Sequence, residues 1–94
     1  MKNNVKHSNE MIRNAKLFGQ MSNPIRCCIL SNLAENDEMC VSDFCSCIGA
    51  SQPLISKYLR QLKDAGLLKS EQRGRFSFYS IKDERVKKIL ECLN

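Results

Sequence analysis

The sequence predicts a mainly α-helical domain with one small β-hairpin, in the order α-α-α-α-β-β-α. Apolar residues recur three and four positions apart in five segments, which is the spacing of one face of an α-helix. Two short strand-like segments flank a glycine at position 74, as in a hairpin. A chain of 94 residues is long enough for one compact domain and too short for two.

The first helix is predicted from Met11, Ala15 and Phe18, which recur at helical spacing with Ile12 beside them. Residues 1–8 precede this apolar stripe and are polar, so we expect them to be frayed. A domain this small is only marginally stable alone, and an exposed amphipathic helix is a usual means of dimerisation.

A loop over residues 19–23 is expected to separate this helix from a second one. Asn23 followed by Pro24 is a strong start signal, because asparagine caps free amide groups and proline fits the first helical position. The apolar stripe of the second helix consists of Cys27, Leu30, Leu33 and Ala34, with Ile29 beside it. The acidic residues 35–38 are predicted to form the next loop.

Residues 41–65 are predicted to form a helix-turn-helix. Ser42 is expected to cap its first helix, which Gly49 ends. Ser51 is expected to cap its second helix, which runs to residue 65 before Gly66. The apolar contacts expected from the two helices come from Phe44, Ile48, Leu54, Ile55, Tyr58, Leu59 and Leu62.

Residues 67–81 are predicted to form the hairpin, with strands over 67–71 and 76–81 joined across Gly74. Residues 82–94 then carry a last apolar stripe, which consists of Val86, Ile89, Leu90 and Leu93. A helix-turn-helix followed at once by a hairpin predicts a winged helix-turn-helix fold for residues 1–94 as a single domain. Its small size and its amphipathic helices, of which residues 82–94 form the last, lead us to expect a dimer.

The positive charge of the chain is concentrated in one segment. The net charge is +5, and residues 52–75 contain six basic side chains against two acidic ones. Residues 35–43 contain acidic side chains and no basic ones. A basic half beside an acidic patch is typical of a nucleic-acid-binding protein, although a solvated charged face has the same composition.

The second helix of the helix-turn-helix has the side chains expected of a reading helix. Its first turns carry Ser51, Gln52 and Ser56, which are small or polar and suit base edges or phosphates. Further basic residues, three apart on this helix or at the hairpin tip, suit phosphates or guanines: Lys57, Arg60, Lys63, Arg73 and Arg75. An ordinary helix pair explains the amphipathic pattern but neither the two tip arginines nor the polar helix start.

Three segments resemble the arsenic-repressor (ArsR/SmtB) family: LFGQMSNPIRCCILSNL, VSDFCSCIGASQPLISKYLRQLKDAGLL and RGRFSFYSI. The resemblance implies a homodimer built on the first and last helices, which binds a pseudo-palindromic operator and represses transcription until an effector binds. The resemblance also implies that the following residues contact DNA: Ser51, Gln52, Ser56, Lys57, Arg60, Arg73 and Arg75.

The six cysteines are expected to be reduced, and thiolates bind soft metals and metalloids. Metal-sensing family members carry Cys-Val-Cys with a further Cys at the start of the third helix. Cys40 and Cys45 match the outer positions, whereas Ser42 replaces the middle one. Cys47 completes the candidate set, but residues two apart on a helix face different sides. Alternatively, Cys45 is a small core residue.

A second candidate group is Cys27 or Cys28 with Cys92, which resembles the dithiol of the family's redox and persulfide sensors. Cys27 lies on an apolar stripe, whereas Cys28 and Cys92 lie off theirs and are expected to be more accessible. The last helix has no histidine, so the family's other metal site is not expected. Metal sensing, redox sensing and the absence of an effector remain open.

Other function classes fit less well. The only histidine is His7, which has no evident catalytic partner, so an enzyme is not expected. No apolar run approaches the length of a membrane span, and the N-terminus lacks a signal sequence. A cytoplasmic protein is therefore expected, with operator DNA and its own second copy as partners and with neither a membrane nor a small organic substrate. DNA binding should need no cofactor. A winged helix that binds protein instead is disfavoured by its basic segment.

Overall fold

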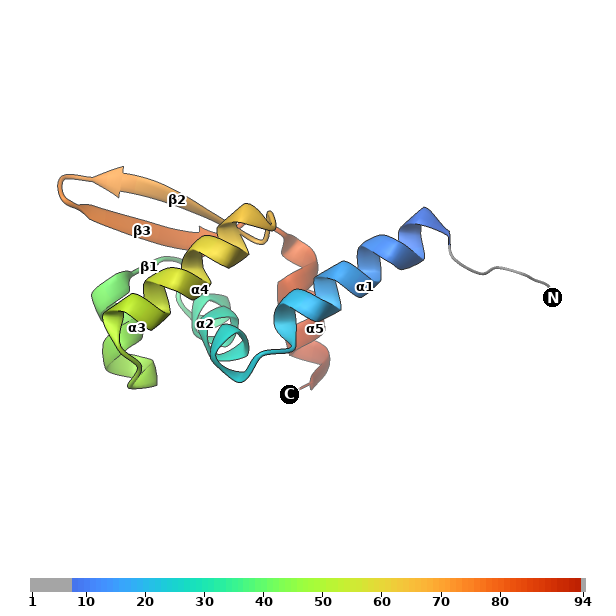
Figure 1. Cartoon of the computed structure of the whole chain (residues 1–94), viewed down its shortest axis with the longest axis horizontal. Coiled ribbons are helices and arrows are strands. Elements are labelled where there is room, and N and C mark those ends of the chain that lie inside the picture. The colour runs from blue at the N-terminus through green and yellow to red at the C-terminus, as the bar shows by residue number, and fades with distance from the viewer. Residues whose placement is uncertain (1–7, 94) are drawn as a thin grey trace.

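The computed structural model describes residues 8–93 and confirms the predicted fold class (Figure 1). The elements in chain order are α1 (Asn9–Met21), α2 (Pro24–Glu35), β1 (Met39–Cys40), α3 (Val41–Ile48), α4 (Gln52–Asp64), β2 (Leu68–Arg73), β3 (Phe76–Ile81) and α5 (Glu84–Leu93). The hairpin of β2 and β3, called the wing below, projects from one end of the helical body, and α1 extends from the other (Figure 1). No helix within residues 8–93 combines the length and apolar character that crossing a membrane requires.

The strands form one antiparallel sheet in the order β1-β3-β2. Strand β1, which the sequence did not predict, pairs Met39 with Tyr79 and so connects the loop after α2 to the base of the wing. Strand β2 extends to Arg73, two residues beyond the predicted end, because the connection is a tight turn with Gly74 at φ 61°.

The core consists of one cluster between the helices and the inner face of the sheet. Its fully buried members come from α2, α3, α4, β2 and α5: Ile29, Leu30, Leu33, Phe44, Ile55, Leu59, Leu62, Leu68 and Val86. The helical members were predicted, whereas the predicted stripe residues Ala34 and Leu93 are exposed because each lies at the C-terminal end of its helix. Helix α1 contributes Leu17 and Met21 instead of its predicted stripe. The predicted stripe residues Met11, Ile12 and Phe18 are about half exposed in the single chain.

Several helix ends match the prediction. Asn23 accepts hydrogen bonds through Oδ1 from the amides of Ile25 (2.8 Å) and Arg26 (3.1 Å). The Ser51 hydroxyl accepts from the amide of Leu54. Glycines that end α3 and α4 adopt positive φ, as a left-handed helix end requires: Gly49 and Gly66.

Other helix ends differ from the prediction. The cap of α3 is Cys40 and not Ser42, because β1 keeps the backbone extended to Cys40, whose amide donates to the carboxylate of Asp43 (3.0 Å). Helix α1 continues through the predicted loop as far as Met21. Ser8, the last residue of the segment expected to fray, caps α1 by accepting from the amide of Met11. The rest of the segment predicted to fray, residues 1–7, lies outside the described residues.

Candidate nucleic-acid interface

Helix α4 presents a polar face to solvent. Its other face is anchored by Ile55, Leu59 and Leu62, which are completely buried against the core. Side chains predicted to meet DNA lie on the exposed face: Ser51, Gln52, Ser56, Lys57, Arg60 and Lys63. The periodicity that buries one side of α4 therefore also brings these side chains together on the other side.

The start of α2 holds α4 in place. The side-chain amide of Asn23 donates to the hydroxyl of Tyr58 (3.3 Å), and Arg26 donates through Nη1 to the Gln61 side chain (2.8 Å). The Arg26 guanidinium also lies 5.5 Å from the centre of the Tyr58 ring. The sequence contained Asn-Pro-x-Arg at this point but did not indicate its long-range partners. The contacts of Asn23 and Arg26 with α4 were therefore not predicted.

A groove of about 700 Å³ separates α3 from the wing and is called the α3–wing groove below. Gln52, at the start of α4, and Arg75, at the turn of the wing, both line it. Cys40 and Cys45 line it on the α3 side. The structure thus brings a predicted base-contacting residue and a predicted wing contact to one recess.

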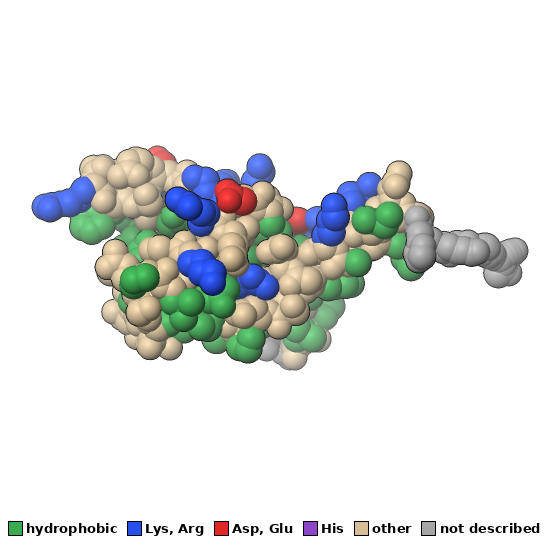
Figure 2. Space-filling view, viewed as in Figure 1, with side chains coloured by type: hydrophobic (Ala, Val, Ile, Leu, Met, Phe, Trp, Pro, Cys, Tyr) green, Lys and Arg blue, Asp and Glu red, His purple; other side chains and the backbone are tan. Residues whose placement is uncertain are grey.

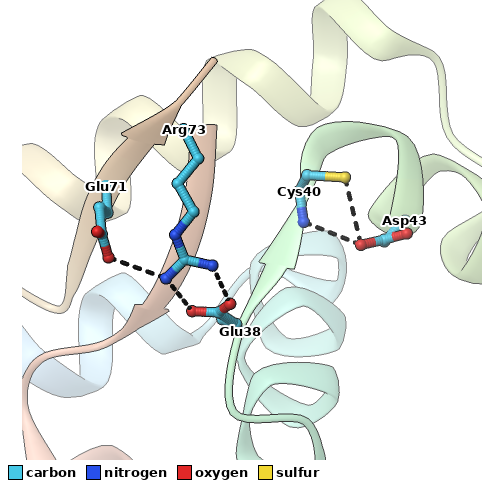
Figure 3. A network of polar contacts seen from close by, with 5 residues as sticks. All are labelled: Glu38, Cys40, Asp43, Glu71 and Arg73. Carbon is cyan, nitrogen blue, oxygen red and sulfur yellow. Dashed lines mark hydrogen bonds and ion pairs between the residues drawn. The ribbon is translucent and has the colours of Figure 1, made fainter. Parts of the chain in front are cut away.

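The two wing arginines occupy different environments. Arg75 lies in the exposed turn, as predicted. Arg73 lies at the end of β2, where both terminal nitrogens donate to the carboxylate of Glu38, and Nη2 also donates to Glu71 at 2.9 Å (Figure 3). Hydrogen bonding to Arg73 lowers the pKa of Glu38, and the same bond raises the pKa of Arg73.

Basic side chains follow the wing, α4 and α1 on the face seen in Figure 2. Figure 2 shows lysine and arginine over the wing, over α4 and along the upper side of α1, with apolar side chains along the lower side. Within residues 8–93, three exposed cations of α4 and the wing turn form neither an ion pair nor a side-chain hydrogen bond: Lys57, Arg60 and Arg75. Lys63 donates to the hydroxyl of Ser70 (2.7 Å) and so ties α4 to β2.

The predicted three-cysteine set is only partly brought together. Cys40 and Cys45 line the α3–wing groove, whereas Cys47 is exposed and does not. The Cys40 thiol donates to the carboxylate of Asp43 (3.3 Å; Figure 3). No group of three or more potential metal ligands gathers within residues 8–93. Cys45 also packs against the core, as its alternative role predicted.

The second cysteine group is distributed over α2 and α5, two helices that contact each other. Cys27 is half-buried against the core, whereas Cys28 and Cys92 are exposed. The six cysteines are all free thiols in this structure.

Comparison with known proteins identifies similar regulators. Residues 23–70 match the family described as bacterial regulatory protein, arsR family. An HTH-type transcriptional regulator of Methanocaldococcus jannaschii is 40% identical over 85% of this chain and 90% of that protein. A cadmium resistance transcriptional regulatory protein CadC homolog of Staphylococcus aureus is 36% identical over 82% of this chain, but the match covers only 64% of that protein.

Solved structures of similar fold are regulators as well. HlyU from Vibrio cholerae gives a TM-score of 0.86 at 28% identity, over 92% of each chain. Reduced HlyU from the same organism gives a TM-score of 0.84, over 89% of this chain and 87% of that one.

Proposed function

Because this chain belongs to the arsR family of bacterial regulatory proteins, we propose that it is a repressor that binds operator DNA as a homodimer. Its relatives and its fold are those of DNA-binding transcriptional regulators and not of enzymes. A chromosomal operator would place the protein in the cytoplasm.

The observation that carries this proposal is that Gln52, at the start of α4, and Arg75, at the turn of the wing, line one groove beside the exposed polar face of α4. A recognition helix enters the major groove with its N-terminal side chains leading, and a wing contacts the adjoining backbone or minor groove. Gln52 is suited to adenine through paired hydrogen bonds, and Ser51 and Ser56 suit bases or phosphates. Basic side chains complete the proposed contact surface: Lys57, Arg60, Lys63 and Arg75.

Binding to a labelled duplex that the protein enriches from a random library tests the proposal. We expect Lys57→Ala with Arg60→Ala to weaken binding by at least about tenfold, since each chain then neutralises two fewer phosphates. Lys82→Ala with Lys88→Ala removes the same charge away from α4 and should have little effect. Equal weakening in both variants would refute the role of α4.

The exposed apolar side chains of the terminal helices support the homodimer. Met11, Ile12 and Phe18 of α1 are 55%, 45% and 57% exposed, and Leu93 of α5 is 73% exposed. Large apolar side chains gathered on the surface typically mark an interface. Phe18→Asp should therefore give a monomer in analytical ultracentrifugation, whereas Phe76→Asp, at a 53% exposed wing residue, should not.

The proposed effector is a soft metal or metalloid ion that binds thiolates. A relative is named for cadmium resistance, and Cys40 and Cys45 face one groove. Cys47 would join them only if α3 rearranged. Cd²⁺ or arsenite added to the reduced protein should produce thiolate charge-transfer absorption and weaken DNA binding, and Cys40→Ser should abolish both effects. No response to either ion would exclude this effector class.

A redox effector is the second candidate, supported by the exposed thiols of Cys28 and Cys92 on contacting helices. Under this alternative, a mild oxidant would change DNA affinity, and Cys92→Ser would remove the change while Cys47→Ser would not. If neither metal nor oxidant acts, DNA binding does not depend on a thiol effector.

A further inference from the structure

We propose that Arg73 positions the wing by holding Glu38 and does not itself contact DNA. This inference rests on the DNA-binding function proposed above. The residues concerned form the wing clasp: Phe78 together with Glu38, Glu71 and Arg73, of which Figure 3 shows the last three. The Arg73 guanidinium meets the carboxylate of Glu38 with two hydrogen bonds and lies 4.8 Å from the centre of the Phe78 ring.

The clasp lies on the outer face of the sheet and reaches from β2 over β3 to Glu38, which directly precedes β1. Directly opposed residues of an antiparallel pair share a face, as do alternate residues along a strand. Phe78 opposes Glu71 of β2 on one side and Cys40 of β1 on the other, and Arg73 follows Glu71 by two. The opposite face is the buried one, since it carries Met39, Leu68 and Ile81.

The wing clasp lies outside the α3–wing groove, although two neighbours on the same face line that groove, namely Phe76 opposite Arg73 and Cys40 opposite Phe78. Ser77 and Tyr79, which alternate with Phe78 along β3, line that groove together with Arg75. The four residues of the wing clasp do not line it. Arg75 therefore shares a recess with Gln52, whereas Arg73 does not.

The charge of the clasp also disfavours a phosphate contact. Two carboxylates surround one guanidinium, so the cluster carries a net charge of −1. If Arg73 turned to a phosphate, Glu38 and Glu71 would be left uncompensated beside a polyanion, and like charges facing each other across an interface are costly. As a clasp, Arg73 neutralises one of the two charges.

The clasp acts where the wing leaves the body. Strand β1 pairs only with Phe78 and Tyr79, so beyond them the wing is a two-stranded ribbon, which twists readily. Arg75 lies three positions before Phe78, a span of about 10 Å at about 3.3 Å per residue. A swing of about 15° at the base would move the tip by about 2.5 Å, enough to break a hydrogen bond to phosphate.

Hydrogen exchange in the free, full-length protein tests the clasp without DNA. Glu38→Gln and Arg73→Met should each raise the exchange rate of the amides of residues 76–78 by about threefold, the range expected for one exposed ion pair. Exchanging the charges, with Glu38→Arg and Arg73→Glu, should restore the rate. All arms carry Glu71→Gln, so that no second carboxylate lies beside position 73. Unchanged hydrogen-exchange rates in both Glu38→Gln and Arg73→Met would overturn the proposal.

DNA binding at several salt concentrations separates positioning from contact. We expect Arg73→Met and Glu38→Gln to weaken binding by similar factors of about three without changing the salt slope, and the charge exchange to restore affinity. Arg75→Ala should make the slope shallower by about 0.9 for each phosphate that Arg75 neutralises. A shallower slope for Arg73→Met, with tighter binding for Glu38→Gln, would overturn the proposal. If the unsubstituted protein does not bind DNA, the proposed function is refuted. The hydrogen-exchange rates of residues 76–78 would still test the wing clasp in that case.

Discussion

The salt dependence of DNA binding can be worked out from the structure. Three exposed cations of the proposed contact surface in each chain have neither an ion-pair partner nor a side-chain hydrogen bond in residues 8–93, namely Lys57, Arg60 and Arg75. The fourth, Lys63, already donates to the hydroxyl of Ser70 and is not counted. A homodimer would neutralise six phosphates, so log K should fall with log salt at a slope of about −5. Between about 50 and 200 mM salt, affinity should then fall by about a thousandfold.

A larger contact surface predicts a different result. If the six basic residues between Gln52 and Arg75 each met a phosphate, the slope would be about −11, and affinity would fall by more than about a millionfold over the same range. Fluorescence anisotropy of a labelled duplex, titrated at several salt concentrations, distinguishes the two values. A slope of about −11, or a slope that Lys57→Ala leaves unchanged, would refute the inference that three cations of each chain neutralise phosphates.

Three further predictions concern the fold and the groove. Leu59→Ala should lower the free energy of unfolding by about 2–5 kcal/mol in urea denaturation, because Leu59 is completely buried; a decrease below about 1 kcal/mol would contradict this packing. Bound DNA should protect Cys40 and Cys45 from alkylation, as read by mass spectrometry, but leave Cys28 and Cys92 reactive; equal protection of the four would place DNA elsewhere. Hydrogen bonding to Arg85 lowers the pKa of Asp83, so the ionised carboxylate stabilises the fold above its unfolded pKa, and this contribution disappears as pH falls through the lower folded value. Asp83→Asn should therefore be destabilising at about pH 7 and neutral near about pH 2 in thermal unfolding, and a destabilisation that persists at the acidic pH would exclude the ion pair as its cause.

The parts of the fold that depend on local chemistry could be predicted from the sequence. Asn23 and Ser51 cap helices because their side chains reach amides two or three residues away, and Gly49 ends a helix because its φ is positive. The stripes of α2 and α4 predicted the core for the same reason, since helix periodicity alone decides which side chains share a face.

Features that depend on distant partners could not be predicted in this way. Strand β1 has two residues, and its pairing with Tyr79 decides that α3 begins after Cys40 and not at Ser42. In α1, Leu17 and Met21 are buried because α2 lies against them, whereas the regular spacing of Met11 and Phe18 marks a surface that the single chain leaves exposed.

The charge available on residues 52–75 also depends on a distant partner and could not be predicted from the sequence. A count over residues 52–75 treats Arg73 and Arg75 alike, because they are two positions apart on either side of Gly74. Glu38, which binds Arg73, lies 35 residues earlier in the acidic stretch that the sequence separated from the basic segment. Folding brings the two together and removes Arg73 from the charge available to DNA. The electrostatic surface is therefore set by the pairing of β1 with β3, which no local charge count contains.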